Sequence, residues 1–397
     1  MIVAATLIFL IGAIGAWLIF DTIDNRRIDA EAVTLKENLT IEFGQPARVS
    51  DFIESLNGEY IDDFAIDTTS LGAVDVQFDY INIKNKKRTA KFNIEIVDTT
   101  APTIYGLSKY SVPVGYEGDL TDLMISVDNI DDFPARNIVG EYNLTQPGTY
   151  KLDYIITDHS GNSTKQPFTL EVFTPTYGNS QSTPATPNTL PISSAIRTHK
   201  TAQTSIGIDV SAWQGTIDWQ KVHEAGVEFA FIRVGYQVDF DAEFMLDRTF
   251  VNNIEGALKA GLPVGVYFYS CANNIDEAKR QAEWILEQVD GYELELGIVF
   301  DWEEWSDFNH ASMSFYTLEK VADAFVETVE ERGYKGLLYG SKNYLNRFWQ
   351  GNTHPVWLAQ YYDHPTYEKD FHFWQFTDAG IVPGISGYVD LDVRYDK

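Results

Sequence analysis

Short apolar runs alternate with helix-like stretches from residue 205 onward, and this alternation constrains the fold more than any other feature of the chain. Between the runs, residues 277–289 and 318–332 carry apolar side chains at spacings of three and four, as amphipathic helices do. Alternating strands and helices predict a parallel sheet, and the length of region 205–397 predicts an irregular α/β barrel of the TIM type. Helix-like stretches become sparse after residue 354, so we expect the last strands to pair with little between them. The expected strands cover residues 206–210, 229–234, 264–269, 297–301, 336–339, 356–360 and 371–376.

One of these runs ends in two carboxylates that are one residue apart, Asp301 and Glu303. Side chains alternate across a strand, so the two acids face the same side, with Cα atoms roughly 6.5 to 7 Å apart. At the C-terminal end of a barrel strand, such a pair lies where barrel enzymes carry out their chemistry. The same acids would also suit the start of a following helix, where negative charge is favoured. The pair alone therefore does not distinguish a helix cap from a catalytic site.

Polar and aromatic residues also gather at the ends of the other expected strands. Asp209 ends the first strand, and Asp390 lies near the end of the chain. Acids and aromatic rings at one end of a barrel suit a polysaccharide, because rings stack on sugar faces and carboxylates perform acid and base steps at a glycosidic bond. Any one aromatic residue taken singly fits a hydrophobic core better. The candidate substrate-binding residues are Trp213, Gln214, Arg233, Tyr267, Tyr269, Tyr339, Trp357, Gln360, Tyr361, Trp374 and Gln375.

Residues 33–173 show short alternating runs and turn residues with almost no helical periodicity, which is an all-β pattern. Two segments repeat when Gly72 is laid on Gly148, and the apolar residues of both copies keep a period of two. This repeat predicts two tandem β-sandwiches, at residues 30–100 and 101–173. Residues 174–204 are rich in Thr, Ser, Pro and Asn, so we expect a flexible linker before the barrel region 205–397.

The first 21 residues contain an apolar run, 2–20, without a charged residue. As a helix this run would measure roughly 28 Å, enough to span the hydrocarbon core of a membrane. We therefore expect a single-pass transmembrane anchor at residues 1–21, with a cleaved signal peptide as the alternative. Arg26 and Arg27 after the run favour a cytoplasmic C-terminus. The kind of domain expected downstream favours the opposite orientation, with the barrel outside the cell.

Charge and cysteine content exclude several classes of function. The formal charge is −29 and the pI is about 4.4, so a nucleic acid is not expected as the main partner. A single cysteine, Cys271, excludes an intramolecular disulfide framework, and we expect it to be a small packed residue rather than a nucleophile. The carboxylates could in principle hold a hard cation, although no histidine lies in these motifs.

The β-rich part resembles the bacterial immunoglobulin-like modules of surface proteins. The resemblance rests on Val-Asp-Thr-Thr-Ala-Pro-Thr-Ile at residues 97–104 and on Asp-His-Ser-Gly-Asn at residues 158–162. It implies two immunoglobulin-like sandwiches. Such modules serve as spacers or as adhesive units, and both roles stay open here.

The C-terminal part resembles the glycoside hydrolase family 25 muramidases, also called Chalaropsis-type lysozymes. The matching motifs are Asp-Val-Ser-Ala-Trp-Gln-Gly at residues 209–215, Phe-Asp-Trp-Glu at 300–303, Trp-Leu-Ala-Gln-Tyr at 357–361 and Gly-Tyr-Val-Asp-Leu at 387–391. The resemblance implies hydrolysis of the β-1,4 bond between N-acetylmuramic acid and N-acetylglucosamine in peptidoglycan. It also implies that Glu303 is the general acid and that Asp209, Asp301 and Asp390 are the other active-site carboxylates. Hydrolysis in this family is implied to need no metal, so we expect neither a metal nor a cofactor.

Within that family, the residue at the position of Asp301 orients the 2-acetamido group of the substrate. The resemblance therefore implies a net-retaining reaction in which this group is the internal nucleophile. Inversion, with Asp209 or Asp390 activating a water molecule, is the alternative. Two other functions also stay open: a chitinase-like amino-sugar hydrolase, and a non-catalytic wall-binding or adhesive protein.

Overall fold

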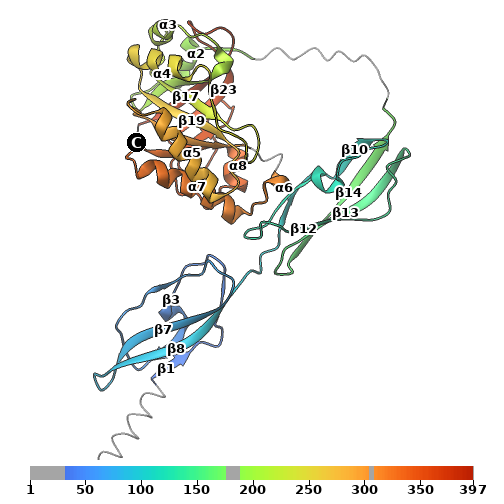
Figure 1. Ribbon diagram of the computed structural model, residues 1–397, viewed down its shortest axis with the longest axis vertical. Coiled ribbons are helices and arrows are strands. Elements are labelled where there is room, and N and C mark those ends of the chain that lie inside the picture. Colours follow the sequence, from blue (N-terminus) through green and yellow to red (C-terminus); the bar gives the residue numbers. More distant parts are fainter. Residues whose placement is uncertain (1–31, 176–187, 304–307, 397) are drawn as a thin grey trace, which may run out of the picture. The chain divides into compact units, whose positions relative to one another are not determined.

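The computed structural model describes residues 32–175, 188–303 and 308–396 (Figure 1). The chain divides into two compact units, residues 1–100 and 101–397. The apolar run 2–20, for which the sequence predicts a transmembrane anchor, lies outside the described residues. Among the residues that are described, no helix has the length and apolar character needed to cross a membrane.

The first unit is an all-β module built around one long hairpin. Alternate residues of its two strands are buried, with Val76, Phe78 and Tyr80 on one strand and Phe92 and Ile94 on the other. This period of two gives the hairpin one core face and one polar face. The hairpin strands are β7 (Gly72–Asn82) and β8 (Lys87–Val97), and the edge strands of the same sheet are β2 (Thr40–Glu42) and β5 (Gly58–Tyr60). Two short pairs complete the module, β1 (Val33–Leu35) with β4 (Ile53–Leu56) and β3 (Ala47–Arg48) with β6 (Ala65–Ile66), together with the 3₁₀ turn η1 (Val49–Phe52).

The second unit begins with a module of the same construction, which we call the second β-module (residues 101–173). The sequence repeat corresponds to one hairpin register, because Val76 pairs with Phe92 in the first module and Leu152 pairs with Phe168 in the second. Its sheet has the order β10 (Lys109–Pro113), β14 (Ser163–Phe173), β13 (Gly148–Thr157) and β12 (Ala135–Val139), and β9 (Thr103–Tyr105) pairs with β11 (Ile125–Val127) beside the 3₁₀ turn η2 (Leu120–Leu123).

The rest of the second unit is a closed ring of eight strands. Hydrogen bonds join neighbours in the order β23, β22, β21, β20, β19, β17, β16 and β24, and the pairing of β23 with β24 closes the ring. The strands from β16 to β23 run parallel to their neighbours, whereas β24 is antiparallel to both β16 and β23. The ring strands are β16 (Thr204–Val210), β17 (Phe229–Tyr236), β19 (Val264–Ser270), β20 (Gly297–Trp302), β21 (Gly336–Ser341), β22 (Val356–Ala359), β23 (Phe373–Ile381) and β24 (Val389–Tyr395), and the short strands β15 (Leu190–Pro191) and β18 (Met245–Leu246) extend β23 and β17.

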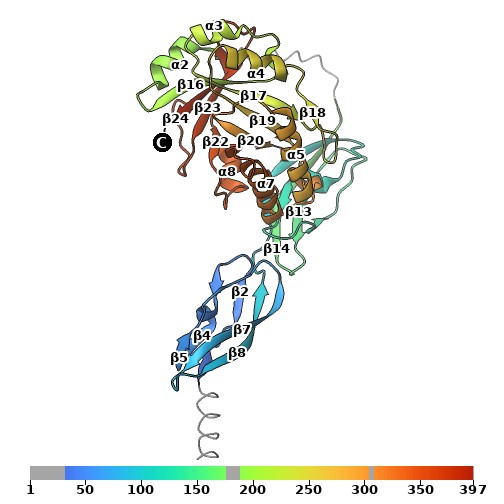
Figure 2. The same cartoon turned by 60° about the vertical axis from the view of Figure 1, so that its left-hand side comes forward.

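This architecture corrects the predicted TIM-like α/β barrel. A TIM barrel has eight parallel strands, each followed by a helix. Here β24 is antiparallel, and residues 359–396, all of which the structure describes, contain no helix. The helices pack outside the ring, as Figure 2 shows. They are α2 (Ile192–His199), α3 (Trp219–Glu224), α4 (Phe250–Lys259), α5 (Ile275–Gln288), α6 (Phe308–Ala311), α7 (Phe315–Glu330) and α8 (Lys342–Arg347), with the 3₁₀ turn η3 (Ala212–Gln214).

The physical reason for the correction lies in the last part of the chain. A parallel pair of strands needs a long crossover, whereas an antiparallel pair needs only a short connection. Seven residues, 382–388, join β23 to β24, so the two strands form a hairpin. The sparse helical pattern after residue 354 indicated this pairing but not its direction.

Two separate cores hold the barrel. Aromatic and branched side chains fill its interior, where Phe231 stacks on Trp357 with ring centroids 4.4 Å apart. A larger core lies between the outer surface of the strands and the helices. Residues 190–199, which fall within the predicted linker, form β15 and α2, and the buried Ile192 and Ala195 of α2 join this outer core. Acidic and other polar side chains gather at the C-terminal ends of the parallel strands.

Candidate active site

The four acids singled out in the sequence line one pocket, of about 250 Å³, at the C-terminal ends of the parallel strands. Asp209 is the penultimate residue of β16, and Asp390 of antiparallel β24 is its direct partner in the strand register. Asp301 is the fifth residue of β20 and Glu303 follows that strand, so the two acids have the spacing expected from the sequence. The pocket is lined by Asp209, Ser211, Trp213, Gln214, Arg233, Tyr267, Tyr269, Asp301, Glu303, Tyr339, Trp357, Tyr361, Gln375 and Asp390.

A glutamine fixes the position of Asp209. The Oε1 atom of Gln375 accepts hydrogen bonds from the hydroxyls of Tyr339, at 2.9 Å, and Tyr361, at 3.0 Å. The amide nitrogen of Gln375 must then point the other way, and it donates to Oδ2 of Asp209 at 2.8 Å. Because Gln375 is buried, this amide cannot turn without leaving buried polar atoms unpaired. Asp209 is therefore held as a fixed, buried carboxyl group.

A further acid that the sequence analysis did not include among the site residues, Asp392, lies on β24 beside Gln375 without lining the pocket. It is fully buried, and its Oδ1 accepts a hydrogen bond from the indole nitrogen of Trp357 at 2.9 Å. Alternation along β24 places Asp390 and Asp392 on the same side, which is the same signal that picked out Asp301 and Glu303. Applying that rule to β24 would have identified Asp392.

Crowding of buried acids changes their protonation. Burial, followed by the charges of Asp390 and Asp392, raises the pKa of Asp209 well above its ordinary value. Burial, followed by the charge of Asp390, does the same to the pKa of Asp392. Burial and then the charge of Asp378 raise the pKa of Asp390 to about 7. At neutral pH this group of acids therefore retains protons.

One rim of the pocket is organised by an ion pair between Arg233 and Asp247. The Nε and Nη2 atoms of Arg233 both lie 2.8 Å from Oδ2 of Asp247. Burial raises the pKa of Asp247, but hydrogen bonds from Thr249, from the Ala212 backbone and from Arg233 outweigh it, and the pKa is lowered. Asp247 is thus a second site residue that the sequence reasoning missed, since it lies outside the predicted strand ends.

The bond from Ala212 to Asp247 also anchors a short turn that presents Trp213 to solvent. Ser211 caps this 3₁₀ turn by accepting from the backbone of Trp213, and Gln214 accepts from the backbone of Ser211. The Trp213 side chain is 85% exposed, although large apolar side chains are normally buried. A capped turn that holds an exposed indole at a pocket rim is suited to stacking on a sugar ring.

Comparison of the sequence with known proteins shows which family the barrel belongs to. Residues 208–385 match the model of the glycosyl hydrolases family 25. The uncharacterized protein YegX of Escherichia coli O6:H1 is 33% identical over 198 residues, which cover 47% of this chain and 68% of YegX. The chain belongs to glycosyl hydrolase family 25.

Two further similar proteins carry functional descriptions. The autolytic lysozyme of Clostridium acetobutylicum is 30% identical over 193 residues, which cover 47% of this chain and 54% of that protein. A family 25 glycosyl hydrolase from Bacillus anthracis is 26% identical, with a TM-score of 0.43, over 50% of this chain and 93% of that chain. As a member of family 25, the chain is a glycoside hydrolase.

Not every predicted binding residue lines the pocket of this family 25 barrel. Trp374 is buried in the outer core, and its indole nitrogen donates to the backbone oxygen of Gln360 at 2.8 Å. Gln360 lines a neighbouring pocket of about 520 Å³ instead. Trp357 touches the central pocket but is 1% exposed, so it packs the barrel interior rather than offering a free face. Both tryptophans are therefore core residues, which is the alternative that the sequence left open for any single aromatic residue.

The central pocket is the middle of a longer cleft. It shares Trp213, Arg233 and Tyr269 with a pocket of about 740 Å³ on one side. It shares Glu303, Tyr339 and Tyr361 with the 520 Å³ pocket on the other. A cleft with acids at its centre and aromatic residues along both arms can hold several sugar units of a chain. A separate pocket of about 620 Å³ opens at the N-terminal ends of the strands and contains none of the predicted residues.

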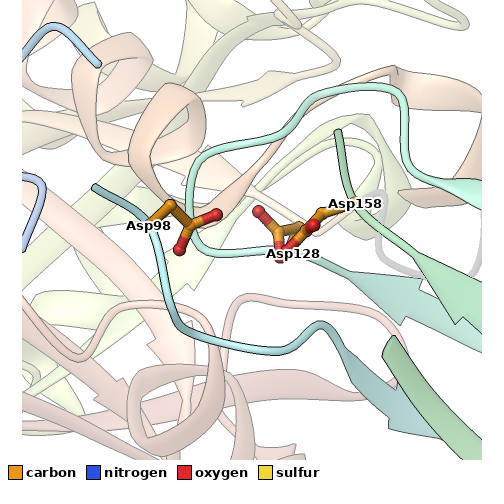
Figure 3. A group of neighbouring side chains, drawn as sticks. All are labelled: Asp98, Asp128 and Asp158. Atoms are coloured by element: carbon orange, nitrogen blue, oxygen red, sulfur yellow. The ribbon is translucent and has the colours of Figure 1, made fainter. Parts of the chain in front are cut away.

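Two other features lie away from this cleft. Cys271 is fully buried, as expected of a small packed residue. In the second β-module, the buried acids Asp128 and Asp158 follow β11 and β13, and one oxygen of each lies within 4.8 Å of the other (Figure 3). Asn162 donates to both oxygens of Asp158, and the backbone of Ile130 donates to Asp128. These hydrogen bonds order the turns after the two strands.

Proposed function

We propose that this family 25 enzyme is a muramidase that cleaves the β-1,4 bond between N-acetylmuramic acid and N-acetylglucosamine in peptidoglycan. The main support is the convergence of Asp209, Asp301, Glu303 and Asp390 from three strands in one cleft. A protein that only binds a glycan does not need such a group of acids, whereas hydrolysis does. The description of the C. acetobutylicum relative as an autolytic lysozyme supports peptidoglycan as the substrate class.

In the proposed first step, Glu303 donates its proton to the oxygen of the scissile bond. The bond between this oxygen and the sugar C1 breaks, and the departing sugar leaves with a hydroxyl group. Glu303 suits this role because it follows the end of β20, at the junction of the central pocket and the 520 Å³ pocket. A glycosidic oxygen lying across that junction would be within reach of its carboxyl group.

In the same step, the acetamido oxygen of the substrate would bond to C1 from the opposite face. Asp301 would accept a hydrogen bond from the acetamido nitrogen and hold the group in place. A water molecule would then attack C1, break the C1–oxygen bond and return a proton to Glu303. Two displacements give net retention of configuration.

The surroundings of Asp209 favour retention over inversion. Inversion requires a carboxylate that is free to take a proton from water. Asp209 is buried, accepts a hydrogen bond from Gln375, and has a raised pKa caused first by burial. Asp390 is less buried and has a pKa of about 7, so it is the stronger candidate for the base of an inverting reaction.

Two measurements on purified peptidoglycan test the proposal. We expect Glu303→Gln to lower kcat by about 10²- to 10⁴-fold, the range for loss of a general acid. Glu283→Gln, a matched change at an exposed position on α5, should leave kcat unchanged. NMR of the first product should show the β-anomer, whereas initial release of the α-anomer would support inversion. Cleavage of chitin oligosaccharides in preference to peptidoglycan would point to a chitinase-like enzyme, and binding without cleavage to a wall-binding protein.

Location at the cell surface, anchored in the membrane and facing the wall, is part of the same proposal. Its support is the sequence of the apolar run 2–20 and the peptidoglycan substrate. Fractionation of cells should recover the full chain in the membrane fraction, and protease added to cells without a wall should remove the barrel. A chain that stays inside protease-treated cells would contradict this location.

A further inference from the structure

The second β-module contacts the barrel through one surface, which we call the docking face and define as residues 124–132. This face consists of β11, the residue before it and the turn after it. Val127 of β11 is 1% exposed and belongs to the same hydrophobic core as the barrel helices. The second β-module and the barrel also lie in one compact unit, 101–397. The contact is therefore a packed interface within that unit.

The docking face completes the first turn of helix α7. The first N–H groups of an α-helix have no partner inside the helix and must be satisfied from outside. The backbone oxygen of Asp128 accepts from the N–H of Phe315, and that of Asn129 accepts from the N–H of Tyr316, both at 2.9 Å. Phe315 and Tyr316 are the first two residues of α7. The backbone of the β-module thus caps a helix of the barrel.

Asp132 adds a charged contact at the same place. Its Oδ1 accepts from the backbone N–H of Ser314 and from the hydroxyl of Thr317, each at 2.7 Å. Ser314 is the N-cap residue of α7, so the carboxylate of Asp132 lies at the positive end of the helix dipole. The interaction combines hydrogen bonding with a favourable charge.

A second contact reaches the short helix α6. Asn309, which is 8% exposed, accepts a hydrogen bond from the backbone N–H of Ser126 at 3.0 Å. Its amide nitrogen donates to the backbone oxygen of Met124 at 2.7 Å. One barrel side chain therefore satisfies a donor and an acceptor of the β-module, as a neighbouring strand would.

Aromatic contacts connect the second β-module to the strand that carries the acids. Tyr105 of β9 packs on Phe348, with ring centroids 5.3 Å apart. Phe348 packs on Phe308 of α6 at 5.6 Å, and Phe308 packs on Trp302 at 5.8 Å. Trp302 is the last residue of β20 and precedes Glu303.

The backbone of Glu303 has a contact with the same group of rings. The hydroxyl of Tyr344 donates to the backbone oxygen of Glu303 at 3.4 Å, and the Tyr344 ring lies 6.1 Å from that of Phe348. Rings that touch in series transmit a displacement, because protein interiors are close-packed. Moving the second β-module would therefore disturb the end of β20.

From these contacts we propose that the second β-module positions Glu303 for catalysis and is not only a spacer. The module holds the start of α7 through Asp132 and the backbone of Asp128, and it holds α6 through Asn309. These two helices follow Glu303 in the chain and pack beside its strand. The proposal rests on the proposed function in that Glu303 is taken as the general acid.

The test uses the full chain with three variants at the contact between the docking face and the barrel. Asp132→Ala removes the acceptor at the start of α7, whereas Asp132→Asn keeps an Oδ1 atom that can accept the same bonds. Asn309→Ala removes the contact to α6. Asp153→Ala is the matched control, because Asp153 lies on β13 of the same module and pairs with Lys165 at the surface. Each variant is measured for kcat and KM on soluble peptidoglycan fragments and for hydrogen exchange of the backbone amides.

We expect Asp132→Ala and Asn309→Ala to lower kcat about ten-fold with little change in KM, because a small misplacement of a catalytic group reduces the rate of the chemical step. Amides at the start of α7 and at the end of β20 should exchange faster in both variants. Asp132→Asn should recover most of the lost kcat, and Asp153→Ala should behave as wild type. If Asn309→Ala fails to fold, Asp132→Ala still tests the proposal, because Asp132 is not fully buried.

Two results would overturn the proposal. The first is an unchanged kcat in Asp132→Ala and Asn309→Ala together with faster exchange at the start of α7, since the module would then hold the helix without affecting Glu303. The second is unchanged hydrogen exchange of residues 297–303 in Asp132→Ala, which would show that the module is not coupled to β20. This result can be read even if wild type does not cleave peptidoglycan, in which case the proposed function fails separately.

Discussion

Asp390→Asn should make the enzyme more stable at neutral pH while impairing it as a catalyst. The folded pKa of Asp390 is about 7, compared with 3.8 for the free side chain. Below pH 3.8 the carboxyl is protonated in both states and costs nothing. As the pH rises from there to 7, the unfolded state releases the proton first, and the folded state loses stability relative to it.

The size of this effect follows from the pKa difference. A shift of about three pH units corresponds to roughly 4 kcal/mol, at 1.36 kcal/mol for each unit. The cost therefore grows by about 1.4 kcal/mol per pH unit between pH 4 and 7 and is constant above pH 7. An asparagine is neutral at every pH and has nearly the same shape. The variant should be equal to wild type near pH 3.5 and more stable by up to about 4 kcal/mol at pH 8.

Urea unfolding followed by tryptophan fluorescence measures this difference. Eight of the nine tryptophans lie between residues 213 and 374, so the signal reports on the barrel. Asp378→Asn is the control, because it removes a neighbouring charge but leaves Asp390 buried, and it should give a smaller gain with the same pH dependence. A gain that is the same at pH 3.5 and pH 8, or no gain at pH 8, would refute the reasoning.

Three other substitutions test separate parts of the structure. Trp213→Ala should raise KM about ten-fold, equivalent to about 1.4 kcal/mol, with little change in kcat, because the sugar ring loses the contact surface of the indole. An unchanged KM would mean that Trp213 does not bind the glycan. Gln375→Ala should lower kcat, since Asp209 loses its donor and two tyrosine hydroxyls lose their acceptor; steady-state kinetics with a melting curve separate this from unfolding. Phe78→Ala should destabilise the first unit by about 3–5 kcal/mol, seen as lost exchange protection in β7, while kcat keeps its wild-type value.

Much of the barrel follows from local patterns in the sequence. Each parallel strand is a short apolar run, and its neighbour in the ring lies near it in the chain. The direction of β24 does not follow from such a pattern, because the alternation of Val389, Leu391 and Val393 is the same in a parallel and an antiparallel strand. Only the short connection before it favours a hairpin.

The site residues were predictable where the position of a residue at a strand end was enough to identify it. Asp209, Asp301, Glu303 and Asp390 could be found from strand position and family motifs, and they do share a pocket. Asp247 could not be found in this way, because its role depends on a partner 14 residues earlier, Arg233. Contacts such as that of Asn309 with the second β-module join residues more than 180 positions apart. No local pattern carries such information.

The antiparallel strand β24 also determines when the pocket can exist during synthesis. It is the last strand of the ring in chain order, and it pairs with the first, β16. Asp390 therefore reaches the pocket only after the whole barrel has left the ribosome, and pairing between such distant segments is slow to form. We expect a chain that still lacks β24 to have an incomplete pocket and no hydrolase activity. Such an interval would allow the chain to be delivered before it is able to cut glycan.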